Sequence, residues 1–90
     1  NNIEVMKINI NWSDLGSYSA LYEKSKKDSN GNVCNLQKQK LSNSKNNIIL
    51  LPKEKKIVLE GINNYIIAEK DNVILIYPKE KDQEIKNLST

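Results

Sequence analysis

The sequence contains no histidine and no arginine, and it has a single cysteine, Cys34. Without histidine, the chain by itself cannot form a Ser-His-Asp triad, a Cys-His dyad or a zinc site that uses imidazole. One cysteine forms neither an intrachain disulfide nor a thiolate metal cluster, so nothing favours secretion and we expect a cytoplasmic protein. We expect Cys34 to be a small, buried or half-buried hydrophobic residue rather than a reactive thiol.

Long apolar segments are also missing. Hydrophobic residues make up 38% of the 90 residues and charged residues 28%, a composition typical of a globular domain and not of a disordered or membrane protein. The longest apolar run, Val73–Tyr77, is far shorter than the ~20 residues that span a bilayer, so we expect no membrane partner. The chain is long enough for one small domain, or for one with a piece of another. Because it begins with Asn1, we expect an excerpt from a longer protein.

The missing arginine weighs against nucleic-acid binding. The net charge is +3, from 14 basic and 11 acidic residues, and a basic chain raises the possibility of a nucleic-acid partner. Arginine is the preferred reader of guanine, however, and the lysines alternate with acidic residues in runs such as Lys53–Lys56 and Lys79–Asp82. Mixed runs of this kind are typical of solvated turns and helix faces. We therefore expect no nucleic-acid partner.

The first third of the chain predicts a strand followed by a helix. Residues 3–10 alternate loosely between apolar and polar types, which predicts a strand. Ser17 is a suitable N-cap for a helix in which Leu21 and Tyr22 lie on the apolar face. The turn-forming residues at 28–32 end this helix.

The rest of the chain predicts a β-rich unit. After a polar stretch at 33–45, four short apolar runs at intervals of about nine residues predict consecutive strands. These runs are residues 47–51, 56–60, 65–68 and 73–77. Ile48–Leu51 and Val73–Ile76 are apolar at successive positions, so we expect another layer or a second subunit to cover both faces of these strands. Residues 79–88 predict a terminal helix with Ile85 facing inward.

Together these elements indicate an α+β, β-rich fold in two parts. Residues 1–28 contain the strand, loop and helix, and residues 33–90 form a small β-rich domain with a terminal helix. The chain has no regular hexapeptide repeat, so the sequence alone does not predict a long regular β-helix.

The segment Asn11–Tyr18 carries the most chemical information. Asp14 follows a predicted strand and precedes a predicted helix, which is where α/β sheets bind ligands. Its carboxylate is a hard oxygen donor suited to magnesium, and Gly16 permits a tight turn or the close approach of a ligand. The residues alone favour a simpler interpretation, in which Asp14 caps the helix and Trp12 packs in the core, because one carboxylate does not make a site.

A resemblance to a known family changes this balance. The segment Trp12–Glu23 contains a tryptophan, a serine, an aspartate, a glycine and a serine followed by an aromatic residue, and it resembles a segment of the mannose-1-phosphate guanylyltransferase (GDP-mannose pyrophosphorylase) family. The stretches Lys27–Val33, Val58–Gly61 and Asp71–Ile76 resemble the family's C-terminal region, so the resemblance extends over essentially the whole chain. The family's glycine-rich nucleotide loop and first metal-binding aspartate have no counterpart in these 90 residues.

The resemblance implies a parent enzyme that transfers GMP from GTP to mannose 1-phosphate, with Mg²⁺ as cofactor. It implies that Asp14 is the catalytic and metal-binding residue. The residues that it implies for the substrate-binding wall are Trp12, Ser13 and Gly16. Residues 1–28 would be the C-terminal end of the nucleotidyltransferase domain, and residues 33–90 a small β-helix-like or β-roll unit that contributes to a homodimer. Because it lacks the nucleotide loop, the fragment alone is expected to be inactive.

Two alternatives stay open at this point. One is a non-catalytic dimerisation or assembly module, which the continuous apolar strands favour. The other is the C-terminal part of a different sugar-1-phosphate nucleotidyltransferase. A glycine-rich loop with an arginine and a lysine upstream of the chain would favour an enzyme over an assembly module.

Overall fold

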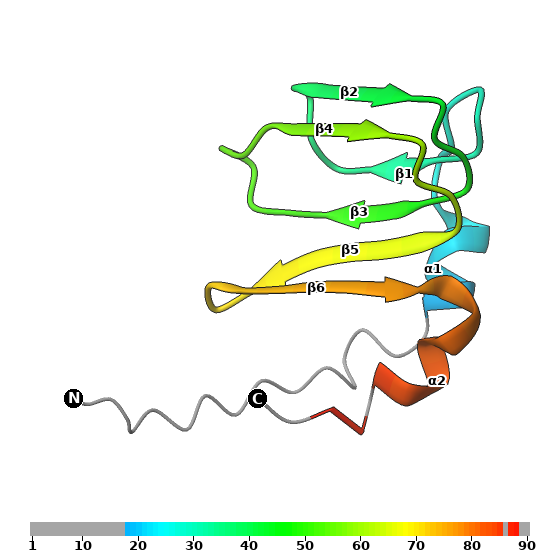
Figure 1. Ribbon diagram of the computed structural model, residues 1–90, viewed down its shortest axis with the longest axis vertical. Coiled ribbons are helices and arrows are strands. Elements are labelled where there is room, and N and C mark those ends of the chain that lie inside the picture. Colours follow the sequence, from blue (N-terminus) through cyan, green and yellow to red (C-terminus); the bar gives the residue numbers. More distant parts are fainter. Residues whose placement is uncertain (1–17, 86, 89–90) are drawn as a thin grey trace.

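The computed structural model describes residues 18–85, 87 and 88, which are mostly β (Figure 1). Six short strands lie between two helical segments. In chain order the elements are α1 (Tyr18–Lys24), β1 (Val33–Cys34), β2 (Gln39–Ser42), β3 (Ile48–Leu50), β4 (Ile57–Glu60), β5 (Tyr65–Lys70), β6 (Val73–Pro78), the 3-10 helix η2 (Lys79–Lys81) and α2 (Asp82–Ile85). Both α-helices lie at the end of the strands where β6 finishes.

The strands form two sheets, and the chain alternates between them. One sheet has the order β1-β3-β5-β6 and the other pairs β2 with β4. The pairs β1–β3, β3–β5 and β2–β4 are parallel, whereas β6 returns antiparallel to β5. Partners in neighbouring parallel strands lie 15 residues apart, as in Val33 and Ile48, or 18 apart, as in Ile48 and Ile66. The chain therefore winds twice through both sheets before the final hairpin.

The mixed sheet is buried on both faces through most of its width. On one face, Ile48 and Ile66 belong to the main hydrophobic cluster together with Ile85 of α2, and Tyr22 of α1 packs against this cluster. The two helices therefore cover part of this face. On the other face Ile67 is buried beside the two-stranded sheet, and it lines a groove together with Leu59 of β4.

Two buried asparagines connect successive turns of the chain at one corner of the fold. The side-chain oxygen of Asn32 accepts hydrogen bonds from the backbone N–H and the side-chain amide of Asn47, both at 3.0 Å. The amides of Asn32 and Asn47 donate to the carbonyls of Ser44 (2.8 Å) and Ile62 (2.7 Å), and Asn47 Oδ1 accepts from Tyr65 N–H at 2.8 Å. Buried polar groups are costly unless they are hydrogen-bonded, so this network favours a single register. We call Asn32, Ser44 and Asn47 the asparagine corner.

The predicted elements in residues 18–88 are largely confirmed. All four apolar runs contain strands, β3 to β6, and α1 is present but ends at Lys24. The terminal helix is a 3-10 turn followed by a single α-helical turn, and Ile85 is buried as expected. The polar stretch at 33–45 contains β1 and β2, which the sequence did not predict. The predicted strand at 3–10 and the N-cap Ser17 lie outside the described residues.

One packing expectation holds for β3 and not for β6. Ile48 and Ile49 are both completely buried, so both faces of β3 are covered. In β6, by contrast, Ile74 is 62% and Ile76 61% exposed, so that face of the edge strand is only partly covered. Among the described residues, the further layer expected over both faces of β6 is therefore missing. In the same part of the chain, no helix combines the length and apolar character that crossing a membrane requires.

Candidate functional site

The residues predicted for the site, Trp12, Ser13, Asp14 and Gly16, lie outside the described residues. The structure instead describes how α1, which begins at Tyr18 four positions after Asp14, is attached to the strands. This attachment is the part of the candidate site that the structure defines.

The attachment centres on the side chain of Tyr22. Its hydroxyl donates to the Gly31 carbonyl at 2.8 Å and lies 3.2 Å from Asn46 Oδ1. The ammonium group of Lys79 lies 3.6 Å from the centroid of the Tyr22 ring and donates to the Asn46 carbonyl at 2.9 Å. We call Tyr22, Gly31, Asn46 and Lys79 the Tyr22 clamp. It joins α1 to three segments that are distant in the sequence.

Local turn chemistry shapes the surface on which Tyr22 sits. The carboxylate of Asp28 accepts hydrogen bonds from the N–H groups of Asn30 (2.8 Å) and Asn32 (2.9 Å), which folds residues 28–32 into a tight turn. Gly31 has φ +80°, and a Cβ there would collide with Asn46 Oδ1 and approach the Tyr22 hydroxyl to 3.2 Å. Glycine is therefore required at this position for two reasons, backbone conformation and space.

Lysines surround the ring of Tyr22. Lys27 Nζ lies 4.6 Å from the ring centroid, in addition to Lys79. Burial lowers the pKa of Lys79, the charge of Lys27 lowers it further, and Glu23 acts in the opposite direction. A cation over an aromatic face is attracted by the ring quadrupole, and more strongly when it is desolvated. The clamp thus combines a partly desolvated cation–π contact with directional hydrogen bonds, which is suited to holding a helix in one orientation.

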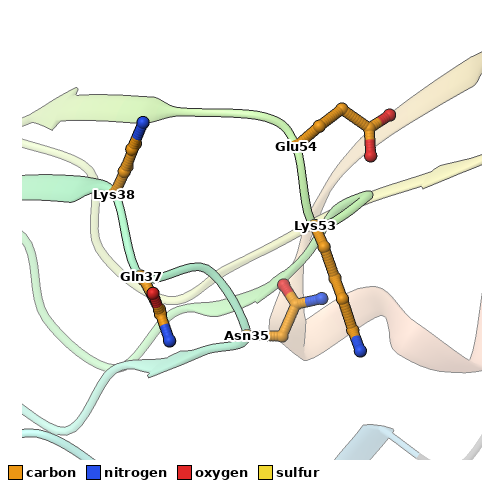
Figure 2. Close-up of a pocket in the computed structure, with 5 residues that line it drawn as sticks. All are labelled: Asn35, Gln37, Lys38, Lys53 and Glu54. Carbon is orange, nitrogen blue, oxygen red and sulfur yellow. The ribbon is translucent and has the colours of Figure 1, made fainter.

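Other cavities in the described part are less informative. Figure 2 shows a polar cavity of about 400 Å³ lined by Asn35, Gln37, Lys38, Lys53 and Glu54. The side chains of Lys53 and Glu54 point in different directions, and that of Asn35 bonds the Leu51 backbone at 2.7 and 3.0 Å. These groups do not converge on one point, so the cavity does not indicate a ligand.

The described residues contain no ready-made metal centre. Within residues 18–85, 87 and 88, no three side chains of His, Cys, Asp or Glu lie close enough together to hold a metal ion. Cys34 is half-buried, and burial raises the pKa of its thiol above the ordinary 9.0. It therefore behaves as the expected small hydrophobic residue, not as a low-pKa thiolate.

Sequence reasoning missed both the asparagine corner and the clamp. One signal for the corner was available, because Asn32-Val33 and Asn47-Ile48 repeat an asparagine before a β-branched residue at a 15-residue interval. For the clamp, apolar spacing correctly places Tyr22 on the inward face of its helix, but no sequence signal links it to Lys79.

Comparison with known proteins identifies the relatives of the chain. A putative mannose-1-phosphate guanylyltransferase of Vibrio cholerae is 32% identical over 84 residues, covering 93% of this chain and 18% of the relative. A mannose-1-phosphate guanylyltransferase of Escherichia coli is 33% identical over 82 residues, covering 91% of this chain and 17% of the relative. The chain is homologous to one region of the mannose-1-phosphate guanylyltransferases. It spans less than a fifth of the length of these curated relatives.

Three further comparisons concern a solved structure, the family models and another relative. A solved structure from Thermus thermophilus, described as a mannose-1-phosphate geranyltransferase, superimposes with a TM-score of 0.61 at 17% identity. It covers 82% of this chain and 22% of that protein, so the fold of this region is shared. No protein-family model matches the chain. An alginate biosynthesis protein AlgA of Pseudomonas putida is 29% identical over 84 residues.

Proposed function

We propose that the chain is the C-terminal region of a mannose-1-phosphate guanylyltransferase, which transfers GMP from GTP to mannose 1-phosphate and releases pyrophosphate and GDP-mannose. The observation that carries the proposal is the homology to proteins of that name over 91 to 93% of the chain. The relative named for alginate biosynthesis supports a role in making GDP-mannose for polysaccharides.

We propose the same division of the chain that the sequence pattern predicts. Residues 1–28 are the end of the nucleotidyltransferase domain, and residues 33–90 are a small β-helix-like unit. The support for such a unit is the parallel pairing of β1, β3 and β5 in one sheet and of β2 and β4 in the other, with the chain alternating between the sheets.

Within this enzyme, Asp14 is the catalytic residue of the chain and its ligand to Mg²⁺. Trp12, Ser13 and Gly16 form the substrate-binding wall around it. Asp14 is the one ligand that we propose for residues 1–28, and the part of the nucleotidyltransferase domain outside this chain would supply the others. Mg²⁺ in such a site neutralises phosphate charge, which phosphoryl-type transfer needs more than covalent help. Asp14 contributes a negatively charged, hard oxygen donor.

A second role, assembly, is favoured by a specific surface. A groove of about 280 Å³, which we call the apolar groove, is lined by Leu59, Ile62, Tyr65, Ile67 and Ile76. Ile76 is exposed, and exposed Ile74 extends the groove along β6. Large exposed apolar patches mark interaction sites, and a two-fold homodimer is the simplest assembly. The enzyme is thus proposed to be a homodimer that uses this unit. In the competing proposal, the chain is an assembly module only.

The decisive experiment is Asp14→Asn in the full-length protein that carries this chain. Asparagine keeps the shape and still caps a helix, but it lacks the charge that a magnesium ligand provides. We expect at least a ~100-fold loss of kcat with GTP and mannose 1-phosphate, which corresponds to about 2.7 kcal/mol of transition-state stabilisation. Thermal unfolding should move by only a few degrees.

Glu54→Gln is the matched control, because Glu54 is an exposed carboxylate at the polar cavity of Figure 2. Its kcat should stay within about twofold of the wild type, since changes at such surface positions are small. Near wild-type turnover for Asp14→Asn would reduce Asp14 to a capping residue and favour the assembly module. The isolated 90-residue chain should show no guanylyltransferase activity in the same assay.

A further inference from the structure

We propose that two copies of this chain pair through the open edge of β4, with Val58 at the two-fold axis and Lys56 of each copy opposite Glu60 of the other. This inference rests on the homodimer proposed above, and it names the strand, the register and the charges that join the two copies.

The two-stranded sheet ends at β4 because the third pass of the chain does not return to it. Strands β1 and β3 are each followed by a strand of the second sheet, whereas β5 is followed by the hairpin to β6 (Figure 1). Among the described residues, no strand pairs with the edge of β4 that faces away from β2. An unpaired strand edge is a ready template for pairing with another chain.

The backbone groups of Val58 point toward this open edge. On the β2 side, Ile57 N–H donates to the Lys38 carbonyl at 3.2 Å. Gly61 N–H, four positions later, donates to the Ser42 carbonyl at 3.0 Å. Because alternate residues of a strand bond opposite neighbours, the N–H and C=O of Val58 face away from β2. Val58 can therefore exchange both backbone hydrogen bonds with Val58 of a second copy that runs antiparallel to the first.

The sequence of β4 is complementary to itself in this register. With Val58 opposite its own copy, Ile57 lies opposite Leu59. Lys56 then lies opposite Glu60 at both ends of the pair. Moving the axis by one residue in either direction loses both matches. Opposite charges across an antiparallel pair are favourable and like charges are not, so the charges select this register.

The outer face of the strand has the side chains that such a pair needs. Val58 is 73% exposed, and Lys56 and Glu60 are exposed on either side of it. No acidic side chain among the described residues forms a salt bridge with Lys56. Asn43 donates to Glu60 Oε2 at 2.7 Å, which holds the carboxylate while Oε1 can still accept a bond from the lysine of the second copy.

The inner face of the pair continues the apolar groove. Ile57 and Leu59 are half-buried and alternate with the exposed residues of β4, and Leu59 lines the groove. A second β4 at the open edge would place its own Ile57 and Leu59 beside this lining. The pairing thus combines buried apolar contact with backbone hydrogen bonds and a charged rim, as specific interfaces do.

The test reverses the charges in the full-length protein that carries this chain. Lys56→Glu places two acidic side chains opposite each other at both ends of the pair, and Glu60→Lys places two lysines there. We expect each variant to raise the Kd of the dimer at least ~10-fold, measured by analytical ultracentrifugation. The double variant Lys56→Glu/Glu60→Lys restores opposite charges and should return Kd to within about threefold of the wild type.

A mixture of the two single variants is a sharper test, because a Lys56→Glu copy is complementary to a Glu60→Lys copy at both ends. Energy transfer between fluorescently labelled copies should be higher in the mixture than within either variant, and ~1 M salt should reduce the difference by screening. Lys38→Glu is the matched control, since Lys38 is an exposed lysine on the β2 side of β4 and should leave Kd unchanged.

Two results would overturn the inference while leaving the dimer in place. One is a wild-type Kd in both single variants, and the other is energy transfer in the mixture that does not exceed that within each variant. A wild type that is monomeric at about 100 μM would overturn the dimer as well. Synthesis of GDP-mannose, assayed in the same samples, tests the proposed function separately. A dimeric wild type without that activity, but with the expected charge dependence, would support the strand pairing and contradict only the proposed reaction.

Discussion

The asparagine corner and the apolar groove meet at Tyr65, and they reverse the usual distribution of polar and apolar residues. At the corner, the amide of Asn47 is completely buried, whereas beside the groove Ile74 is 62% exposed. The backbone N–H of Tyr65 donates to Asn47, and its side chain lines the groove. The buried hydrogen bonds of the corner fix one winding of the chain. Among the described residues, the groove leaves apolar surface exposed, and this is the surface that we propose for a second copy of the chain.

The largest expected effect comes from removing the amide at the corner. Asn47→Ala removes the side-chain partner of the Tyr65 N–H, and it removes one of two hydrogen bonds at both the Ile62 carbonyl and Asn32 Oδ1. A buried group left unsatisfied costs about 1–3 kcal/mol and each further lost hydrogen bond about 0.5–1.5 kcal/mol, so the free energy of unfolding should fall by about 3 kcal/mol or more. For a domain of this size, that lowers the midpoint of thermal unfolding by about 12 °C or more.

Asn63→Ala is the control for this prediction. Asn63 is an exposed asparagine that accepts one hydrogen bond, from Lys45 N–H at 3.0 Å. Its removal should cost less than about 1 kcal/mol. Equal losses in the two variants, measured by calorimetry, would mean that the buried amides add nothing beyond an ordinary surface contact.

The next prediction uses two glycines with the same backbone conformation. Gly31 (φ +80°) belongs to the clamp and has no room for a Cβ, whereas a Cβ at Gly61 (φ +68°) would have nothing within 4 Å. Gly61→Ala suffers only the strain of the left-handed conformation, about 1–2 kcal/mol. Gly31→Ala must in addition displace Asn46 or Tyr22, and we expect at least about 1 kcal/mol more. Chemical denaturation of both variants measures the difference in free energy of unfolding. Equal losses would show that Asn46 and Tyr22 move aside with no loss of stability.

Some strands of the fold could be predicted from the sequence and others could not. The strands β3 to β6 were predictable because each is a run of apolar residues bounded by turn formers. The strands β1 and β2 were not, because Val33–Cys34 has only two residues and Gln39–Ser42 is mostly polar. They are strands because β3 and β4 pair with them in parallel, 15 and 18 residues further along the chain. Parallel pairing at that separation leaves no local signal.

The candidate site likewise has parts that the sequence indicates and a part that it does not. The segment around Asp14 is recognisable from its residue types and its resemblance to a family, and its role stays a prediction. Apolar spacing correctly places Tyr22 on the inner face of its helix. Its partner Lys79 lies in a mixed-charge run that looks like a solvated surface, 57 positions after Tyr22 in the chain. Only the folded arrangement of the strands brings Lys79 to the ring of Tyr22.

A smaller effect is expected at the groove, on assembly and not on folding. If the groove joins two copies, the isolated chain should be mostly dimeric at about 100 μM, a concentration that populates even a dimer with Kd of ~10 μM. Ile76→Lys should weaken the dimer at least ~10-fold, which corresponds to about 1.4 kcal/mol. Leu21→Lys is the control, since Leu21 is exposed on α1 and does not line the groove. Light scattering that shows a monomeric wild type at this concentration contradicts the dimer.

The smallest effect concerns Cys34, which lies in the same cross-strand row as the groove residue Ile76. The row runs from Cys34 through Ile49 and Ile67 to Ile76, from one edge of the sheet to the other. Both ends are incompletely covered, but burial still raises the pKa of the Cys34 thiol above 9.0. The folded state therefore holds its proton to higher pH than the unfolded state does. This contribution to stability is present below pH 9.0 and is lost as the pH rises above that value.

Cys34→Ala isolates this contribution from the other groups that titrate in the same range. The difference in free energy of unfolding between the wild type and Cys34→Ala should be constant up to about pH 8 and should then shrink as the thiolate forms in the unfolded chain. Urea titrations of both proteins between about pH 7 and pH 10.5 measure it, and alkylation by iodoacetamide should report an apparent thiol pKa above 9.0 in the folded wild type. A difference that does not change with pH would place Cys34 in a solvated environment. The β1 edge of the row would then be as open to solvent as the β6 edge. Exposure of the sheet would in that case no longer distinguish the groove from the opposite edge.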